Sequence, residues 1–155
     1  MKQGVYALII ENKQDHCVQI GKLGNFLFKQ GFYTYIGSAL GKSATSLDIR
    51  LKRHLSSKKK LFWHIDFFLN SKYVKIQTII YTNTILKEEC SLASAVFQIP
   101  NAQIPVTRFG ASDCKRINHS SHLFHFEMEK NELIELVKSA FLKINLLPIT
   151  MKIKN

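Results

Sequence analysis

The stretch that decides the fold runs from residue 4 to residue 54 and carries three short segments: GVY at 4–6, YIG at 35–37 and RLKRH at 50–54. The first two segments lie in short apolar runs that are typical of β-strands. The third places an arginine and a histidine four positions apart, which is about one helical turn. Strands followed by a helix in this order indicate an α+β fold.

Apolar runs and helical periodicity predict the other elements of the chain. Strands are expected at residues 5–10, 17–20, 26–28, 32–36, 74–81 and 123–126. Helices are expected from about residue 47 and over residues 63–69, 88–97 and 129–144. Together they predict a small antiparallel or mixed β-sheet flanked by helices in a single domain, residues 1–145. Residues 146–155 form a basic C-terminal tail that is expected to fray.

The charge balance points to a polyanionic partner. The chain has 155 residues, with 22 lysines and arginines against 11 acidic residues and a formal net charge of +11. Clustered cations release counterions from a phosphate backbone and so gain affinity for nucleic acid. A basic surface that only keeps the protein in solution is the alternative.

The cysteines and the hydropathy pattern indicate a soluble, cytoplasmic protein. Cys17, Cys90 and Cys114 form an odd set with no close pair in sequence, which argues against a disulfide framework and favours a reducing compartment. No apolar run reaches the roughly 18 residues of a membrane span. The apolar run after Lys2 is short and stops at Glu11, unlike a signal peptide.

Four side chains suit phosphodiester hydrolysis, which needs a deprotonated water and positive charge at the reacting phosphate. Tyr6 and Tyr35 sit on predicted strands, where their phenolic oxygens can orient or deprotonate a water. Arg50 offers a planar fork of donors for a phosphate, and His54 follows one helical turn later. The structural alternatives are tyrosines that pack in the core and an arginine that is merely solvated.

A metal ligand and a close approach of the backbone complete the candidate site. Glu88 and Glu89 open a predicted helix, and hard cations such as Mg²⁺ prefer oxygen ligands. The same carboxylates also favour the helix dipole with no metal present. Gly4 and Gly37 would let the backbone lie close to a phosphate.

These residues resemble the motifs of the GIY-YIG nuclease superfamily. The segment YIGSALG at residues 35–41 and the segment RLKRHL at 50–55 resemble its second motif and its first catalytic helix. The resemblance implies an endonuclease that uses one Mg²⁺ or Mn²⁺ ion. It assigns generation of the attacking water to Tyr6, further catalytic roles to Tyr35, Arg50 and His54, and the metal to Glu89. Asn101 is a weak candidate for a second metal-proximal residue.

The likeness is closer to one branch, the Uri-type endonucleases. Residues 63–68 read WHIDFF, and FGASDC at 109–114 is followed by SHLF at 121–124, as in signatures of that branch. Val5 departs from the isoleucine of the first motif, and the connection 41–47 before the helix is longer than in many members. The supporting positions are Gly4, Gly37, His64, Asp66, Asp113 and His122. A buried His64 or Asp66 would brace the catalytic helix.

A zinc site is an alternative for the second signature. Cys114, His119, His122 and His125, with Asp113 beside them, are the candidate ligands. Their spacing fits no common closed zinc pattern. The other interpretation is that Asp113, His119 and His122 line the nuclease groove.

The basic run 42–60 predicts a surface that contacts phosphates without reading sequence. Its candidate nucleic-acid contacts are Lys42, Lys52, Arg53, Lys58, Lys59 and Lys60. Phe62 and Trp63 could stack on an unpaired base, although core packing is favoured for them. The expected protein is an endonuclease of low sequence specificity whose expected substrate is DNA rather than RNA. It is expected to act as a monomer or weak homodimer, with DNA repair as a suggested setting. The alternative is a nucleic-acid-binding module with a nuclease-like fold and no catalysis.

Overall fold

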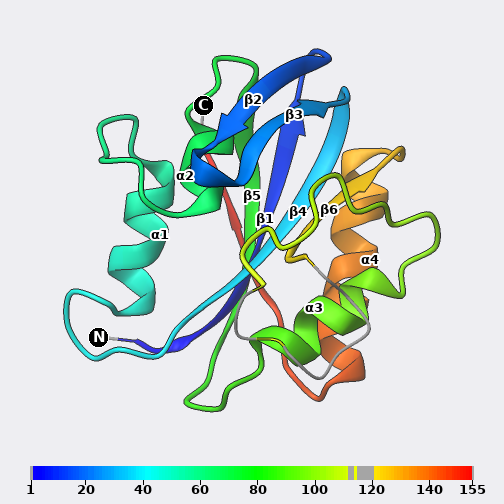
Figure 1. Cartoon of the computed structure of the whole chain (residues 1–155). Coiled ribbons are helices and arrows are strands. Elements are labelled where there is room, and N and C mark those ends of the chain that lie inside the picture. Colours follow the sequence, from blue (N-terminus) through cyan, green and yellow to red (C-terminus); the bar gives the residue numbers. More distant parts are fainter. Residues whose placement is uncertain (1, 112–113, 115–120, 155) are drawn as a thin grey trace.

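A computed structural model of the chain describes residues 2–111, 114 and 121–154, and it has the predicted α+β fold in a single domain. Five strands form one antiparallel sheet in the order β6-β4-β1-β5-β7 (Figure 1). Their bounds are β1 Gly4–Asn12, β4 Gly31–Ala39, β5 Val74–Asn83, β6 Leu123–Phe126 and β7 Ile149–Lys152. A separate hairpin joins β2 His16–Ile20 to β3 Gly24–Phe28 through a short 3₁₀ turn at Gly21–Leu23.

Helices cover both faces of the sheet. They are α1 Leu47–Leu55, α2 His64–Leu69, α3 Glu89–Phe97 and α4 Lys130–Lys143. The helices α1 and α2 lie on one side of the sheet, and α3 and α4 lie on the other (Figure 1). Each of these elements was predicted within a residue or two, because its apolar residues recur at the period of its own structure. In the described residues no helix is long and apolar enough to cross a bilayer.

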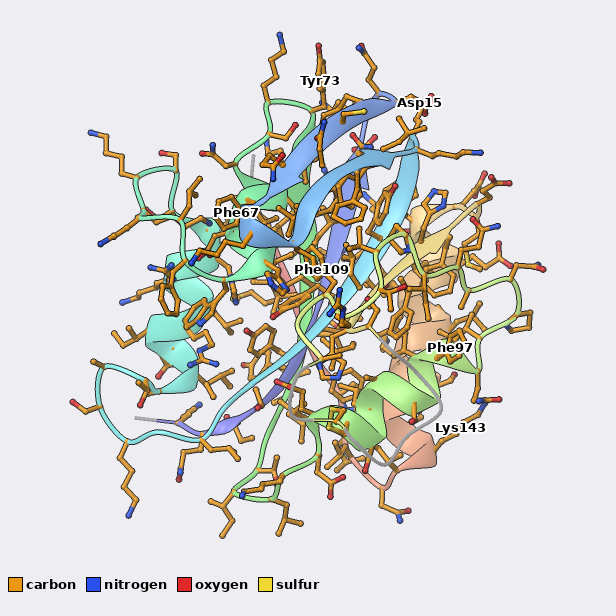
Figure 2. The ribbon with its side chains drawn as sticks, in the orientation of Figure 1. Asp15, Phe67, Tyr73, Phe97, Phe109 and Lys143 are labelled. Carbon is orange, nitrogen blue, oxygen red and sulfur yellow. A yellow bond between two sulfur atoms is a disulfide. The ribbon has the colours of Figure 1, made fainter. Side chains whose placement is uncertain are left out.

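The central strand β1 divides the apolar core into two halves. Tyr6, Leu8 and Ile10 pack with Leu51 of α1 and Phe68 of α2. Val5, Ala7 and Ile9 pack with residues of α3 and α4. Successive side chains of a strand point to opposite faces, so a strand buried on both faces reads as an unbroken apolar run. Figure 2 shows the side chains that fill the space between the sheet and the helices.

The chain's last strand corrects one expectation. Residues Ile149–Lys152 form β7 and pair with Thr78–Tyr81 of β5, so this part of the basic tail is ordered rather than frayed. The residues of β7 alternate between apolar and polar, but all four are exposed, so neither face of the strand is buried in the core. Backbone pairing at the sheet edge forms it instead.

The cysteines correct a second expectation, that the chain has no disulfide. Cys90 of α3 and Cys114 form a disulfide, with Cα atoms 5.7 Å apart, which is an ordinary separation for a bridged pair. The two residues are 24 positions apart, so no local spacing reveals them as a pair. Among the described residues Cys17 is the free cysteine, and it is exposed. The prediction of a chain without a disulfide is therefore wrong for this structure.

Candidate active site

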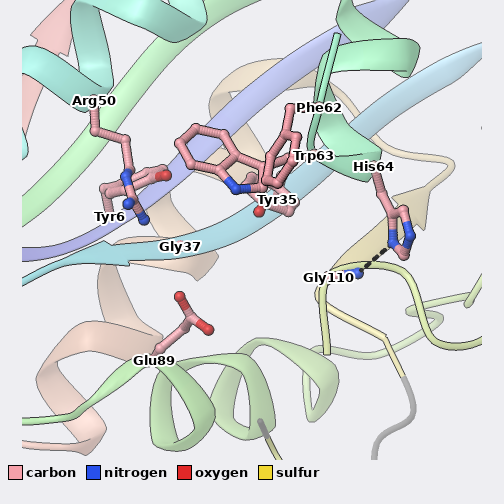
Figure 3. Close-up of a pocket in the computed structure, with 9 residues that line it drawn as sticks. All are labelled: Tyr6, Tyr35, Gly37, Arg50, Phe62, Trp63, His64, Glu89 and Gly110. Atoms are coloured by element: carbon pink, nitrogen blue, oxygen red, sulfur yellow. Dashed lines mark hydrogen bonds between the residues drawn. The ribbon is translucent and has the colours of Figure 1, made fainter. Parts of the chain in front are cut away.

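A pocket of about 320 Å³ lies where α1, the start of α2 and the start of α3 meet strand β4 (Figure 3). It brings together six of the predicted site residues from separate elements: Tyr6, Tyr35, Gly37, Arg50, His64 and Glu89. The other lining residues are Phe62, Trp63 and Gly110. Between the first and the last of these residues lie more than half of the positions in the chain, so the pocket is a product of the fold.

The short strand β6 explains how α3 reaches a pocket on the other side of the sheet. Strand β6 pairs with β4 over Phe32–Tyr35, and in the part of the chain that the structure describes no strand pairs with Ile36–Ala39 on that side. The first turn of α3 lies beside this free edge, and Figure 3 shows Glu89 pointing from α3 towards it, across β4 from Arg50 and Tyr6. Ile36 also donates its backbone N–H to His122 O at 2.9 Å.

Two glycines are required by close packing in and near the pocket. Gly37 pairs with Tyr6 across β4 and β1, and a Cβ at position 37 would overlap the Tyr6 hydroxyl. A Cβ at Gly4 would overlap the backbone oxygen of Thr82. Gly37 thus makes room for the tyrosine, and Gly4 lies in a tight backbone contact rather than in the pocket lining.

Tyr6 and His54 form a buried hydrogen-bonded pair. The Tyr6 hydroxyl and His54 Nε2 lie 2.6 Å apart, and His54 is only 3% exposed. Burial, reinforced by the positive charge of Lys59, lowers the pKa of His54 to about 3, so its imidazole is neutral near pH 7. His54 lies behind Tyr6 and does not line the pocket itself.

Both tyrosines of the pocket are protonated phenols near neutral pH. Burial raises the pKa of Tyr6 well above its usual range, and the nearby Tyr35 and Glu89 raise it further, whereas Arg50 lowers it. Burial also raises the pKa of Tyr35, with Glu89 adding to the effect. The Tyr35 ring lies edge-on to His54 and to Phe109, with centroids 6.1 Å apart in both cases.

The guanidinium groups of Arg50 and Arg53 both stack on Trp63. Each Cζ lies 4.6 Å from the centroid of the Trp63 rings, which is within cation–π range. Arg50 also donates Nη1–H to Ser38 O at 2.5 Å and lines the pocket. Trp63 therefore packs against the apolar core and also holds Arg50 in place.

Asp66 ties α2 to α1. Its side chain is fully buried, and its Oδ2 accepts hydrogen bonds from Arg53 Nη2 at 2.5 Å and from the backbone N–H groups of Phe62 and Trp63 at 3.0 and 2.9 Å. Arg53 also donates to Lys60 O at 2.9 Å. Arg53, a predicted nucleic-acid contact, is therefore engaged within the protein. It fixes the position of α1 relative to α2.

Glu89 is the carboxylate of the pocket. Its side chain is 24% exposed, and its Oε2 lies 3.3 Å from Nδ1 of the buried His122. Glu88, the alternative metal ligand, precedes α3 as its N-cap residue and does not line the pocket. Asn101, with a positive φ of 66°, lies in a turn away from the pocket lining. Asp113 and His119 lie outside the described residues.

The predicted lysine contacts lie before, within and after α1. Lys42, Lys52, Lys58 and Lys60 are exposed. Lys59 is partly buried, and its Nζ donates to the carbonyl oxygens of His54 and Arg53 at 3.0 and 3.3 Å. A cation at this place satisfies carbonyl groups that the end of a helix leaves unpaired.

Sequence reasoning missed several residues of this region. Gly110 enters the pocket because its backbone N–H donates to His64 Nδ1 at 3.1 Å. Cys90 was not linked to His122, yet these two residues and Cys114 converge beside Glu89. Phe62 is 74% exposed at the pocket, so core packing was the wrong interpretation for it. An aromatic residue directly after the lysine run was the available signal.

The comparisons with known proteins identify a family but no activity. No curated protein and no solved structure gives a significant match to the chain. One family model matches residues 5–146, which include the described pocket residues. The chain therefore belongs to the family described as "Domain of unknown function DUF123".

Proposed function

We propose that this chain is a metal-dependent endonuclease resembling the GIY-YIG nucleases, and that it hydrolyses phosphodiester bonds in nucleic acid. DNA rather than RNA is the proposed substrate, and sequence specificity is low. The main support is the convergence of Tyr6, Tyr35, Arg50 and Glu89 in one polar pocket, because these residues come from four different elements. A polyanionic substrate agrees with the net charge of +11.

Glu89 has the chemistry of a ligand for a single hard cation. Magnesium is commonly bound by one or two carboxylates while it retains several waters, so one partly exposed carboxylate facing a polar pocket is sufficient. When bound there, a Mg²⁺ or Mn²⁺ ion supplies positive charge to the reacting phosphate and the leaving oxygen. The two phenols of the pocket offer further polar contacts for water.

Tyr6 and His54 suit the handling of the attacking water's proton. Tyr6 lines the pocket, and its hydroxyl is 2.6 Å from the neutral His54 imidazole. As the Tyr6 oxygen takes a proton from the water, its own proton can pass to His54 Nε2, so no charged phenolate has to persist in the buried site. The anionic phosphate beside the pair favours the imidazolium that this transfer produces.

Arg50 suits the binding of the scissile phosphate. Its guanidinium lines the pocket, and the contacts with Ser38 O and Trp63 restrict its orientation. A guanidinium that is already oriented before the reaction stabilises the negative charge that develops on the phosphate, without reorganisation. The exposed lysines around α1 then position the rest of the backbone without distinguishing one sequence from another.

The test compares two neighbouring carboxylates. Wild type, Glu89→Gln and Glu88→Gln are incubated with labelled single-stranded, duplex and flapped DNA in Mg²⁺, Mn²⁺ or EDTA. We expect wild type and Glu88→Gln to cut in metal but not in EDTA. Glu89→Gln should lose at least about a hundredfold in rate, as when one group that stabilises a transition state is removed.

Equal cleavage by the two variants would refute the assignment of Glu89. Binding without cleavage by the wild type under every condition would instead identify a nucleic-acid-binding module with this fold. Far-ultraviolet circular dichroism of each variant checks that a loss of rate is not a loss of structure.

A further inference from the structure

A cluster of sulfur and imidazole groups lies next to the pocket, on the α3 side of Glu89. Cys90 is in the first turn of α3, Cys114 is in the segment before β6, and His122 directly precedes that strand. Their potential ligand atoms all lie within 4.8 Å of one another, with Cys114 Sγ 3.0 Å from His122 Nε2. Helix α3 and the segment that leads into β6 thus converge on one point.

The two nitrogens of His122 have different surroundings. Its Nε2 faces Cys114 Sγ at 3.0 Å, whereas its Nδ1 lies 3.3 Å from Oε2 of Glu89. Metal-bound histidines commonly use one ring nitrogen as the ligand and hold the other against a carboxylate, which fixes the ring and raises its basicity. The ring is fully buried, so its orientation is set by the fold.

We propose that Cys90, Cys114 and His122 form a redox-controlled zinc site, in which the reduced cysteines and His122 Nε2 bind Zn²⁺ and the disulfide is the metal-free alternative. Two thiolates and one imidazole are a common zinc ligand set, and water can complete a tetrahedron. The disulfide cannot bind zinc in the same way, because its sulfurs carry no thiolate charge. Only a small separation of the two sulfurs is needed, since both already face the imidazole.

A low-molecular-weight disulfide is the oxidant that converts the zinc-bound state into the disulfide state. Its S–S bond takes two electrons from the protein thiolates and two protons from the solvent, and becomes two thiols. The thiolates of Cys90 and Cys114 lose those two electrons, form their own S–S bond and release Zn²⁺. Reduction by a dithiol runs the same step backwards and restores the ligands.

This inference is independent of the proposed nuclease activity, so its test uses no nucleic acid. The full chain is stripped of metal and prepared in reduced and oxidised forms, the latter with oxidised glutathione. Zn²⁺ affinity is measured by competition with a coloured chelator, and Co²⁺ is added anaerobically to detect thiolate-to-cobalt charge-transfer absorption. The variants are Cys90→Ser and His122→Gln, with Cys17→Ser as the matched control because Cys17 is exposed and unpaired among the described residues.

We expect one Zn²⁺ per chain in reduced wild type and in Cys17→Ser, at least about tenfold weaker binding in the other two variants, and loss of binding on oxidation. The cobalt spectrum of the wild type is a second readout that needs no variant to fold. Reduced wild type that binds Zn²⁺ no more tightly than Cys90→Ser would overturn the proposal. Equal binding by the oxidised and reduced forms would also overturn it.

Discussion

The two sides of the pocket are built by different chemistry. On the α1–α2 side, the buried carboxylate of Asp66 holds the Arg53 guanidinium and the backbone N–H of Trp63, and the Trp63 indole contacts Arg50. On the α3 side, Glu89 stands beside a disulfide that joins α3 to the segment before β6. The first side is fixed by noncovalent contacts that form whenever the chain folds. The second is fixed by a bond that depends on the redox state of its surroundings.

Removal of the buried charge should have the largest effect on stability. Asp66→Asn leaves Arg53 without its anionic partner, and breaking a buried ion pair in this way costs about 4 kcal/mol. Urea unfolding measures the loss. Asp48→Asn, an exposed acid in the first turn of α1, is the control and should cost at most about 1 kcal/mol. Equal losses in the two variants would show that the α1–α2 side does not depend on Asp66.

Reduction of the Cys90–Cys114 disulfide should destabilise only the α3 side of the pocket. With EDTA present to exclude metal, dithiothreitol should lower the free energy of unfolding by about 3 kcal/mol, because the disulfide closes a loop between residues 24 positions apart. Cys17→Ser should respond as wild type does. Cys90→Ser should show no change with reductant. If the unfolding curves of wild type are the same with and without reductant, the disulfide does not stabilise the α3 side.

The pH dependence of the free energy of unfolding should reflect the protonation of His54. Its folded pKa of about 3 lies below the ordinary value of 6.5, so between these values only the unfolded chain binds the proton. Its contribution is therefore complete above pH 6.5 and is lost as the pH falls towards 3, at about 1.4 kcal/mol per pH unit. In urea unfolding between pH 4 and 6, His54→Gln should lack this slope. Tyr6→Phe should retain it, since burial is the first cause of the shift, and a slope unchanged in His54→Gln would contradict the prediction.

The smallest effect is expected at the mouth of the pocket. Phe62→Ala should change stability by less than about 0.5 kcal/mol, since the ring is 74% exposed. If the ring stacks on an unpaired base, single-stranded DNA should bind about 1 kcal/mol more weakly. Fluorescence anisotropy measures this against Ile85→Ala, which removes a similarly exposed side chain that is not among the lining residues of the pocket. Identical affinities in the two variants would exclude stacking by Phe62.

The sequence predicted the α+β fold because its central elements carry strong local signals. Strand β1 is an unbroken apolar run, and Leu47 and Leu51 of α1 share one buried face. The same regularity placed Tyr6, Tyr35 and Arg50 near one another, since paired strands and a helix on one face leave little freedom. Glu89 was singled out by its position at a helix start and by resemblance to a family motif.

The parts that escaped prediction depend on contacts between distant segments. Cys90 and Cys114 meet only because α3 packs beside the segment that leads into β6. Strand β7 is short and exposed, and it exists through its pairing with β5. Trp63 packs against the core as its sequence suggests, but its contacts with two guanidinium groups of α1 depend on the tertiary fold.

The contact of Trp63 with Arg50 and Arg53 gives the molecule an intrinsic optical probe. Trp63 is the single tryptophan of the chain, and its indole lines the pocket beside two cations. Indole emission responds to nearby charge, so any anion that draws Arg50 away from the ring changes the fluorescence of the whole protein. Occupancy of the pocket can therefore be followed in real time without a label on the protein or on its ligand.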